Sequence, residues 1–227
     1  MSKIPKKLHY IWFGRGKKSS EFEKYLESWK KYCPDYEIIE WNENNFDINK
    51  NSYCKKFYDK KKWAFASDYA RIDILYNEGG IYLDTDIEIL KNLDGFLDNK
   101  LFIGFQDVFS IGGSVIGCEK NNPIIGEILD VYKTKKTRIV IPNLLNRIFK
   151  KYGVISYSNV IIKTNDFTIY PKDYFYPFAY FENKKYMKIT KNTFIIHHYD
   201  ATWLPKIITK IVFPLIGIYI KIRYKNI

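Results

Sequence analysis

The sequence predicts a single α/β domain built on a mixed central sheet. Strand-like and helix-like segments alternate over the first 90 residues, which is the pattern of a sheet with crossover helices. The 227 residues are enough for one sizeable core but too few for two. Hydrophobic residues make up 46% and charged residues 27% of the chain, a composition typical of folded domains, which argues against disorder.

Apolar runs and the residues that bound them predict the first strands and helices. Residues 8–13 are apolar and aromatic and end in a glycine turn, which predicts a buried first strand. Ser20 begins the next segment and Glu23 follows three residues later, a capping-box pattern that predicts a helix ending before Pro34. Residues 37–41 are a second short strand, and residues 54–62 resemble a helix with a solvated face.

Residues 63–80 are predicted to form one buried helix that ends at a glycine pair. Phe65, Tyr69, Ile72 and Tyr76 recur at helical spacing, and an adjoining stripe is also apolar. The glycines supply a C-terminal cap and a turn. Residues 81–83 are then a buried strand, and residues 87–90 are the next one.

The second half of the chain gives weaker patterns. Residues 101–105 and 113–118 are predicted as strands, residues 122–133 as a helix, and residues 193–203 as a strand that runs into a loop. We divide the chain into a catalytic domain, residues 1–205, and a C-terminal segment, residues 206–227.

The C-terminal segment is apolar and basic at once. Its apolar run, residues 211–220, is half the length of a membrane span and is flanked by Lys206, Lys210, Lys221, Arg223 and Lys225. Such a segment suits the interface of an anionic membrane. A core helix with a solvated basic edge is the alternative.

Charge and cysteine content limit the partners and the compartment. The formal charge of +12 favours nucleic acid, phosphorylated small molecules or an anionic membrane, but no nucleic-acid motif is present. Cys33, Cys54 and Cys118 are far apart and form no metal or disulfide framework, which fits a reducing cytoplasm. The N-terminal apolar run is too short for a signal peptide.

Asp84 and Asp86 are the first candidates for chemistry. An apolar strand delivers both carboxylates into a turn, and ligands of open α/β sheets bind at the carboxyl ends of strands. Two carboxylates there suit Mg²⁺ or Mn²⁺ and leave coordination positions for diphosphate oxygens. An ordinary acidic turn is the alternative.

Asp68 and Arg71 are three residues apart on an otherwise apolar helix, so they share a face. Burying them without partners is costly. They form either an intrahelical ion pair or a sugar-binding pair beside the metal, with Asp68 accepting and Arg71 donating hydrogen bonds to hydroxyls.

Residues 66–86, ASDYARIDILYNEGGIYLDTD, resemble the DXD-containing sugar-binding region of glycosyltransferase family 32. That family includes bacterial capsular polysaccharide synthesis transferases and fungal mannosyltransferases. The same segment is similar to the catalytic domains of the clostridial glucosylating toxins. Residues 4–14, 28–41 and 195–203 also match, so the resemblance spans residues 4–203.

The resemblance implies a GT-A fold, with a Rossmann-like mixed sheet, and a metal-dependent transferase. It implies Mn²⁺ or Mg²⁺, a UDP- or GDP-sugar donor, and retaining transfer of a hexose or N-acetylhexosamine to a saccharide. The acceptor expected from capsule synthesis is linked to undecaprenyl diphosphate. The protein is then expected to be cytoplasmic and peripheral on the inner face of a bacterial plasma membrane, and to bind no nucleic acid.

The resemblance also assigns roles to residues. Asp68, Arg71, Asp84 and Asp86 would be catalytic, and Trp12 would stack on the nucleobase. His198 would join Asp84 and Asp86 on the metal, because neighbouring strand residues point to opposite faces and His197 would then face away. The donor-binding set is Ile11, Trp12, Phe13, Ser67, Asp68, Arg71, Tyr82, Asp84 and Trp203.

Two positions depart from the family pattern. Ala201 stands where the family has a serine, so we expect one hydrogen bond to phosphate or metal to be absent. Gly112 and Gly113 replace an expected asparagine.

Two other functions are alternatives. One is a haloacid-dehalogenase-like phosphatase, but such an enzyme would have Thr or Val at the position that Glu88 occupies here. A non-enzymatic basic module, binding a membrane or nucleic acid, is the other alternative.

Overall fold

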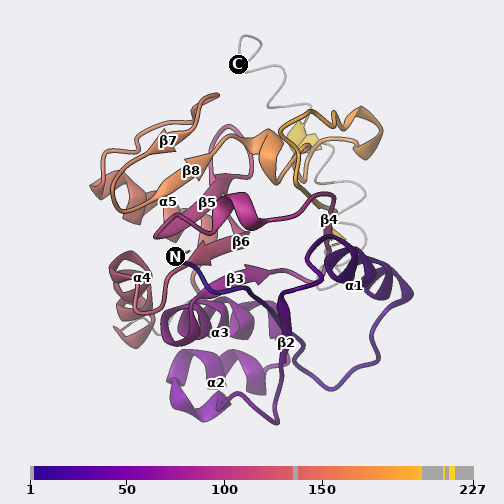
Figure 1. Cartoon of the computed structure of the whole chain (residues 1–227). Helices are drawn as coiled ribbons and strands as arrows, with labels where there is room; N and C mark the ends of the chain where they lie inside the picture. Colours follow the sequence, from indigo (N-terminus) through magenta and orange to yellow (C-terminus); the bar gives the residue numbers. More distant parts are fainter. Residues whose placement is uncertain (1–2, 135–137, 201–211, 213–214, 218–227) are drawn as a thin grey trace.

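The computed structural model describes residues 3–134, 138–200, 212 and 215–217 (Figure 1). The strands of the main sheet are β1 (Lys7–Ile11), β2 (Glu37–Trp41), β3 (Gly80–Leu83), β5 (Leu101–Phe105), β6 (Ile111–Cys118), β7 (Ile162–Lys163) and β8 (Thr168–Tyr170). A separate two-stranded sheet pairs β4 (Ile87–Ile89) with β9 (Ile195–His197).

The α-helices of the described ranges are α1 (Ser20–Tyr32), α2 (Ser52–Asp59), α3 (Trp63–Glu78), α4 (Pro123–Thr134) and α5 (Ile141–Lys151). Short 3₁₀ turns occupy Ile48–Lys50, Asp94–Phe96, Lys172–Tyr174 and Lys184–Tyr186. The predicted strands and helices up to β4 are confirmed with small shifts of their ends. Strands β7 and β8 were not predicted, because they are only two and three residues long. Helix α5 was not predicted either, although Pro142 in its first turn and Gly153 after it are end signals.

The prediction of a mixed central sheet is confirmed. The strand order is β2-β1-β3-β6-β5-β8-β7. Strand β1 pairs in parallel with β2 and β3, and β5 pairs in parallel with β8. Strand β6 is antiparallel to both β3 and β5, and β7 is antiparallel to β8. This order puts the ends of β1 and β3 side by side near the middle of the sheet.

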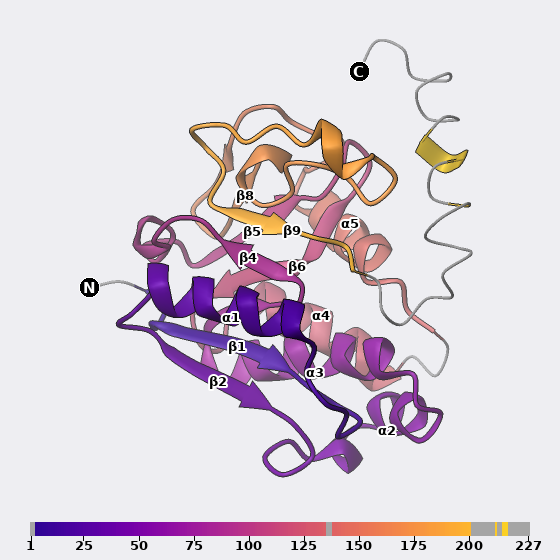
Figure 2. The ribbon, with the colours of Figure 1, turned by 90° about the vertical axis from the view of Figure 1, so that its right-hand side faces the viewer.

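Alternation along the strands builds a separate core on each face of the sheet. In β3, Ile81 and Leu83 pack with residues of α1, β4 and β9, whereas Tyr82 packs with residues of α2 to α5. Figure 2 shows α1 in front of the sheet and α4 behind it. Since both faces are covered, the strands are apolar on both sides. A polar side chain at a strand end therefore stands out against this background.

One predicted cap is corrected by the structure. Ser19, not Ser20, is the N-cap of α1, and its hydroxyl accepts a hydrogen bond from the Phe22 amide at 3.1 Å. Glu23 therefore lies one position too late for a capping box. The C-terminal cap of α3 is Gly79, as predicted, with φ 67° and its amide bonded to the Leu75 carbonyl. That φ is in the left-handed region that glycine adopts without strain.

Buried His9 joins the cap of α3 to the sheet. Its Nε2 lies 2.9 Å from the Gly79 carbonyl oxygen, and the Trp41 indole lies 3.1 Å from its Nδ1. The ring must therefore be neutral, with Nε2 donating and Nδ1 accepting. Burial lowers the pKa of His9 to about 4.

We expect His9 to make the fold less stable in mild acid. The unfolded chain takes up a proton on His9 below about pH 6.5, whereas the folded chain resists it down to about pH 4. Stability therefore falls across this window, by up to about 3 kcal/mol at its lower end. Urea unfolding between pH 7.5 and 4.5 should show a smaller loss for His9→Gln than for the parent. Equal pH slopes for the two proteins would contradict this origin.

Part of the C-terminal prediction lies outside the described residues. Of the segment 206–227, only residues 212 and 215–217 are described, so its predicted membrane association stays a prediction. Within the described ranges, no helix combines the length and apolar character that crossing a bilayer requires.

Candidate active site

The DXD turn lies where the main sheet and the small sheet separate. The Asp84 amide donates to the Ser114 carbonyl at 3.0 Å, so Asp84 still follows β3 along β6. Two residues later the Asp86 carbonyl accepts from the His198 amide at 2.9 Å, at the start of the β4–β9 pairing. The change of sheet between Asp84 and Asp86 opens the strand end, and both aspartates line a cavity there.

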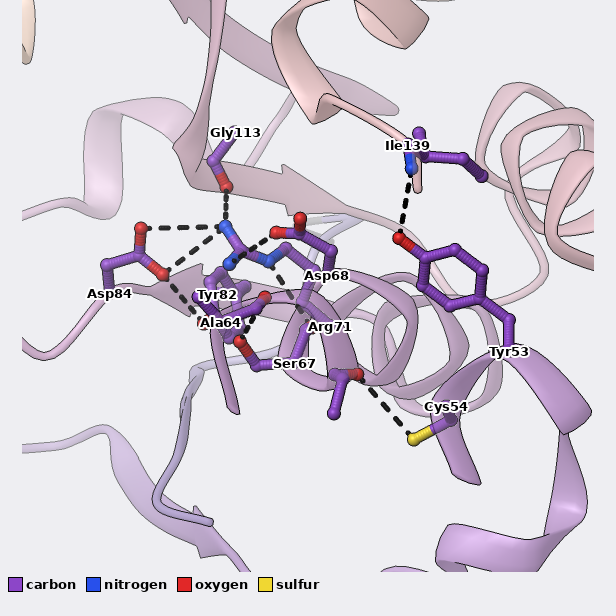
Figure 3. Close-up of polar contacts among 11 residues, drawn as sticks. Tyr53, Cys54, Ala64, Ser67, Asp68, Arg71, Tyr82, Asp84, Gly113 and Ile139 are labelled. Carbon is purple, nitrogen blue, oxygen red and sulfur yellow. Dashed lines mark hydrogen bonds and ion pairs between the residues drawn. The ribbon is translucent and has the colours of Figure 1, made fainter. Parts of the chain in front are cut away.

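Arg71 connects α3 to this turn (Figure 3). Its guanidinium bonds the Asp68 carboxylate at 2.9 Å and the Gly113 carbonyl at 2.8 Å, and it lies 3.3 Å from the Asp84 carboxylate. It also lies over the Tyr82 ring at 4.7 Å, and the Tyr82 hydroxyl donates to Asp84 at 2.8 Å. The two interpretations of Asp68 and Arg71 are thus compatible, since they form an ion pair and also line the cavity.

Burial affects the pKa values of Asp68 and Arg71. Burial raises the pKa of Asp68 to about 7, against the opposing effect of Arg71. Burial also disfavours the charge of Arg71, but Asp84, Tyr82 and Asp68 together raise its pKa above the ordinary value. Arg71 is therefore a permanent cation. The second oxygen of Asp68 has no protein hydrogen-bond partner among the described residues, which leaves it available to a ligand in the cavity.

Asp84, Asp86 and His197 form a candidate metal site. One potential ligand atom from each of the three lies within 4.8 Å of the others. His197 Nε2 is 3.1 Å from Asp86 Oδ1. Burial works against a charge on either group, yet their mutual attraction prevails, raising the pKa of His197 and lowering that of Asp86. Two carboxylates and an imidazole are a donor set that fits Mn²⁺ well and Mg²⁺ acceptably, so these residues fit the implied cation.

The structure corrects the assignment of His198 to the metal. His198 Nε2 bonds Glu88 at 2.8 Å, its Nδ1 lies 2.6 Å from the Lys184 ammonium, and its ring stacks on Tyr25. Strand alternation does admit only one of the two histidines, because their side chains point to opposite faces. The face was misassigned, because it is His197 that points toward the turn, with its Nε2 3.1 Å from Asp86 Oδ1; burial does not distinguish the two histidines, since both side chains are largely buried. Tyr199, with φ 53°, then turns the chain away from strand geometry.

The cavity around the turn has a volume of about 580 Å³. It gathers residues from β1, α3, β3 and β9 that are far apart in the sequence. Eight of the nine residues predicted to bind the donor line it: Ile11, Trp12, Phe13, Ser67, Asp68, Arg71, Tyr82 and Asp84. The ninth, Trp203, lies outside the described residues. Trp12 stacks on Phe22 at 5.5 Å, and its indole nitrogen donates to the Gly16 carbonyl, so the ring is held in place.

No sequence motif indicated the far wall of the cavity. Gln106, Tyr180, Tyr199 and residues 138–142 line it. The segment 138–142 leads into α5, and the amide of Ile139 donates to the hydroxyl of Tyr53, a fully buried residue of α2. Of these, the one available signal was the aromatic residue directly after the two histidines. The rest belong to loops whose residues carry no motif.

The glycine pair that replaces the expected asparagine has a structural explanation. A Cβ on Gly112 would lie 2.4 Å from the Tyr176 hydroxyl, so no side chain fits there. The Gly113 carbonyl is the 2.8 Å partner of Arg71. The main chain thus takes part in holding Arg71. Ala201, the other departure, lies outside the described residues.

A mixed α/β sheet whose central strand delivers a DXD turn into a cavity, beside a buried Asp–Arg pair, defines a GT-A glycosyltransferase. The comparisons agree with this class. The profile described as "Glycosyltransferase sugar-binding region containing DXD motif" matches residues 19–103. The solved structure of the PaToxG glycosyltransferase superposes with a TM-score of 0.53 at 24% identity, covering 66% of this chain and 70% of that one, which supports the fold.

Curated relatives are glycosyltransferases too. One, an uncharacterized glycosyltransferase of Acanthamoeba polyphaga mimivirus, is 28% identical over 219 residues, which is 89% of this chain and 84% of the relative. The lactosylceramide 4-alpha-galactosyltransferase of Homo sapiens is 32% identical over 126 residues, which is 54% of this chain and 35% of the relative. The chain thus spans about a third of that relative's length. The matched profile and these relatives support a glycosyltransferase of the family 32 type, with a DXD sugar-binding region.

Proposed function

We propose that the protein transfers a hexose or N-acetylhexosamine from a UDP- or GDP-sugar to a saccharide, with retention of the anomeric configuration. The observation that carries the proposal is the joining of two sites in one cavity. Asp84, Asp86 and His197 form a candidate cation site, and Asp68 with Arg71 lies beside it. A nucleotide-sugar needs both features, because its diphosphate and its sugar are adjacent parts of one molecule.

Each residue then has a defined task. Asp84, Asp86 and His197 would hold a divalent cation, which would supply charge neutralisation for the departing nucleotide diphosphate. Arg71 fixes the Asp84 carboxylate and the Gly113 carbonyl. The free oxygen of Asp68 accepts a hydrogen bond from a sugar hydroxyl, and Trp12 stacks on the base. The acceptor oxygen would bond the anomeric carbon on the face from which the nucleotide diphosphate departs and give its proton to that diphosphate, so the protein would need neither a nucleophile nor a base of its own.

Retention and a lipid-linked acceptor are further parts of the proposal. The human relative is named an alpha-galactosyltransferase that acts on lactosylceramide, a saccharide carried by a lipid. By analogy, and by resemblance to capsule transferases, we propose a lipid-linked acceptor such as an undecaprenyl-diphosphate saccharide in capsular or exopolysaccharide synthesis. The protein would then work at the inner face of a plasma membrane, with residues 206–227 in the lipid interface.

Donor hydrolysis tests the proposal directly. We expect one UDP- or GDP-sugar, from a panel supplied with Mn²⁺, to be cleaved slowly without an acceptor. EDTA should lower this rate at least about a hundredfold, since the cation supplies several kcal/mol, and added Mn²⁺ should restore it. NMR of the first sugar released should show the donor's anomeric form. Cleavage of generic phosphate esters, or hydrolysis that EDTA leaves unchanged, would contradict the proposal.

A further inference from the structure

A loop at the far edge of the main sheet has an unusual composition. Residues 150–163, KKYGVISYSNVIIK, run from the end of α5 to the edge strand β7 and contain no acidic residue. The sheet order puts β7 at the end opposite β2, and Figure 1 shows β7 and α5 at that end of the molecule. This loop lines no part of the active-site cavity.

Apolar side chains of the loop point outward. Of the nine exposed large apolar residues in the described ranges, four lie within these fourteen positions. They are Tyr152, 42% exposed, Ile155, 81%, Val160, 71%, and Ile161, 43%. Single exposed apolar residues are normal on a soluble surface, but a group of four in ten residues marks an interaction site.

The loop is nevertheless anchored to the fold. Val154 and Tyr157 pack against the core, and the Tyr157 ring lies 5.1 Å from that of Phe105. The Val154 amide donates to the Phe149 carbonyl at 3.1 Å. The Ser158 hydroxyl bonds the Val160 carbonyl at 2.7 Å. The outward apolar residues are therefore presented by an ordered backbone with its own inner contacts.

Cations flank the apolar residues on both sides. Lys150 and Lys163 are exposed and have no carboxylate partner within the described part of the chain. Arg147 lies one helical turn before Lys150 on the exposed side of α5. Lys151 pairs with Glu127. Glu127 also accepts a hydrogen bond from the Tyr152 hydroxyl. Four cations against this one carboxylate leave the loop and the end of α5 with a net positive charge, which is complementary to anionic headgroups.

We propose that residues 150–163 dock the protein on an anionic lipid bilayer, with Ile155, Val160 and Ile161 entering the interface and Lys150 and Lys163 contacting headgroups. Apolar burial and electrostatic attraction act together in such binding. The eleven residues of α5 span about 16 Å, and Ile141 and Pro142 at the other end of this helix line the cavity. The cavity would therefore lie one helix length from the bilayer, within reach of the lipid-linked acceptor in the proposed function.

Vesicle flotation of the full chain tests the docking independently of catalysis. The test variants are Ile155→Ser with Val160→Ser, and Lys150→Glu with Lys163→Glu. The matched control is Lys188→Glu with Ile189→Ser, another exposed cation and apolar residue. We expect each test variant to bind phosphatidylglycerol vesicles about tenfold or more weakly than the parent, and the control to bind like the parent. Donor hydrolysis, or thermal unfolding if no donor is cleaved, verifies folding.

A fluorescent label shows where contact occurs. The three native thiols are buried, so Ile155→Cys can be labelled selectively with an environment-sensitive dye. We expect a blue shift with anionic vesicles, none with phosphatidylcholine vesicles, and none for labelled Ile189→Cys. Unchanged flotation of both test variants, or a label that stays in water, would overturn the proposal. Concentration-dependent dimers broken by the same variants would assign the surface to a second copy instead.

Discussion

Replacing Asp86 with alanine is expected to lower donor hydrolysis and transfer at least about a hundredfold, a loss of about 3 kcal/mol or more. Asp86 is the best placed of the predicted cation ligands, because its Oδ1 lies 3.1 Å from His197 Nε2 and its Oδ2 accepts from the Asp200 amide. Initial rates at saturating Mn²⁺ measure the effect. Calorimetry of Mn²⁺ binding should show the same variant losing affinity for the cation.

The two neighbouring histidines provide a matched control for this site. His197→Ala should follow Asp86→Ala, with weaker Mn²⁺ binding and a similar loss of rate. His198→Ala should stay within about tenfold of the parent, because its contacts are with Glu88, Lys184 and Tyr25 outside the metal cluster. Near-normal turnover of Asp86→Ala, or a larger loss for His198→Ala than for His197→Ala, would contradict the metal site.

Replacing Arg71 with methionine is expected to affect both stability and activity. Its guanidinium is buried and contacts Asp68, Asp84 and the Gly113 carbonyl. Removing one partner of a buried ion pair leaves an uncompensated charge, which costs about 3–5 kcal/mol in the free energy of unfolding. The rate should also fall about a hundredfold, because Asp84 loses a positioning contact beside the transferred sugar. Urea unfolding and initial rates measure the two effects.

Two companion variants separate these effects. Arg71→Lys keeps the charge but loses the planar fork, so stability should recover further than activity. Asp68→Asn with Arg71→Met removes one unpaired carboxylate and should regain part of the stability without regaining the rate. Full recovery of turnover in the double variant would show that Arg71 acts only on the fold.

The positions of the residues around the DXD turn were predictable from local patterns, whereas their roles stayed open until the resemblance to a family was considered. Three local signals precede Asp84 and Asp86: a buried helix with apolar residues at helical spacing, a glycine pair and a short apolar strand. Together they predict where the two aspartates follow the end of the strand. Asp68 and Arg71 stand out since charges on an otherwise apolar helix require partners. The grouping of Trp12 with these residues depended on the resemblance to a family, because nothing in the local pattern of β1 connects it to a turn seventy residues later.

The histidine ligand and the far wall of the cavity were not predictable in the same way. A three-residue strand such as β9 has alternating faces, but only tertiary contacts decide what each face meets. His197 lies beside Asp86 and Tyr176, whereas His198 stacks on Tyr25 of α1. Residues 138–142 reach the cavity through α5, an element whose own sequence gave no sign of its position.

The sequence by itself determined the α/β class, the strand that ends in the two aspartates and the Asp–Arg pair of α3, since each depends on hydrophobic period or on the cost of burying charge within a few residues. Tertiary structure alone decided that β4 leaves the main sheet to pair with β9, and with it that His197 meets Asp86 while His198 meets Glu88. That choice depends on pairing between segments about 110 residues apart. The register between such distant segments depends on how the whole core packs, and no local stretch of the chain specifies it.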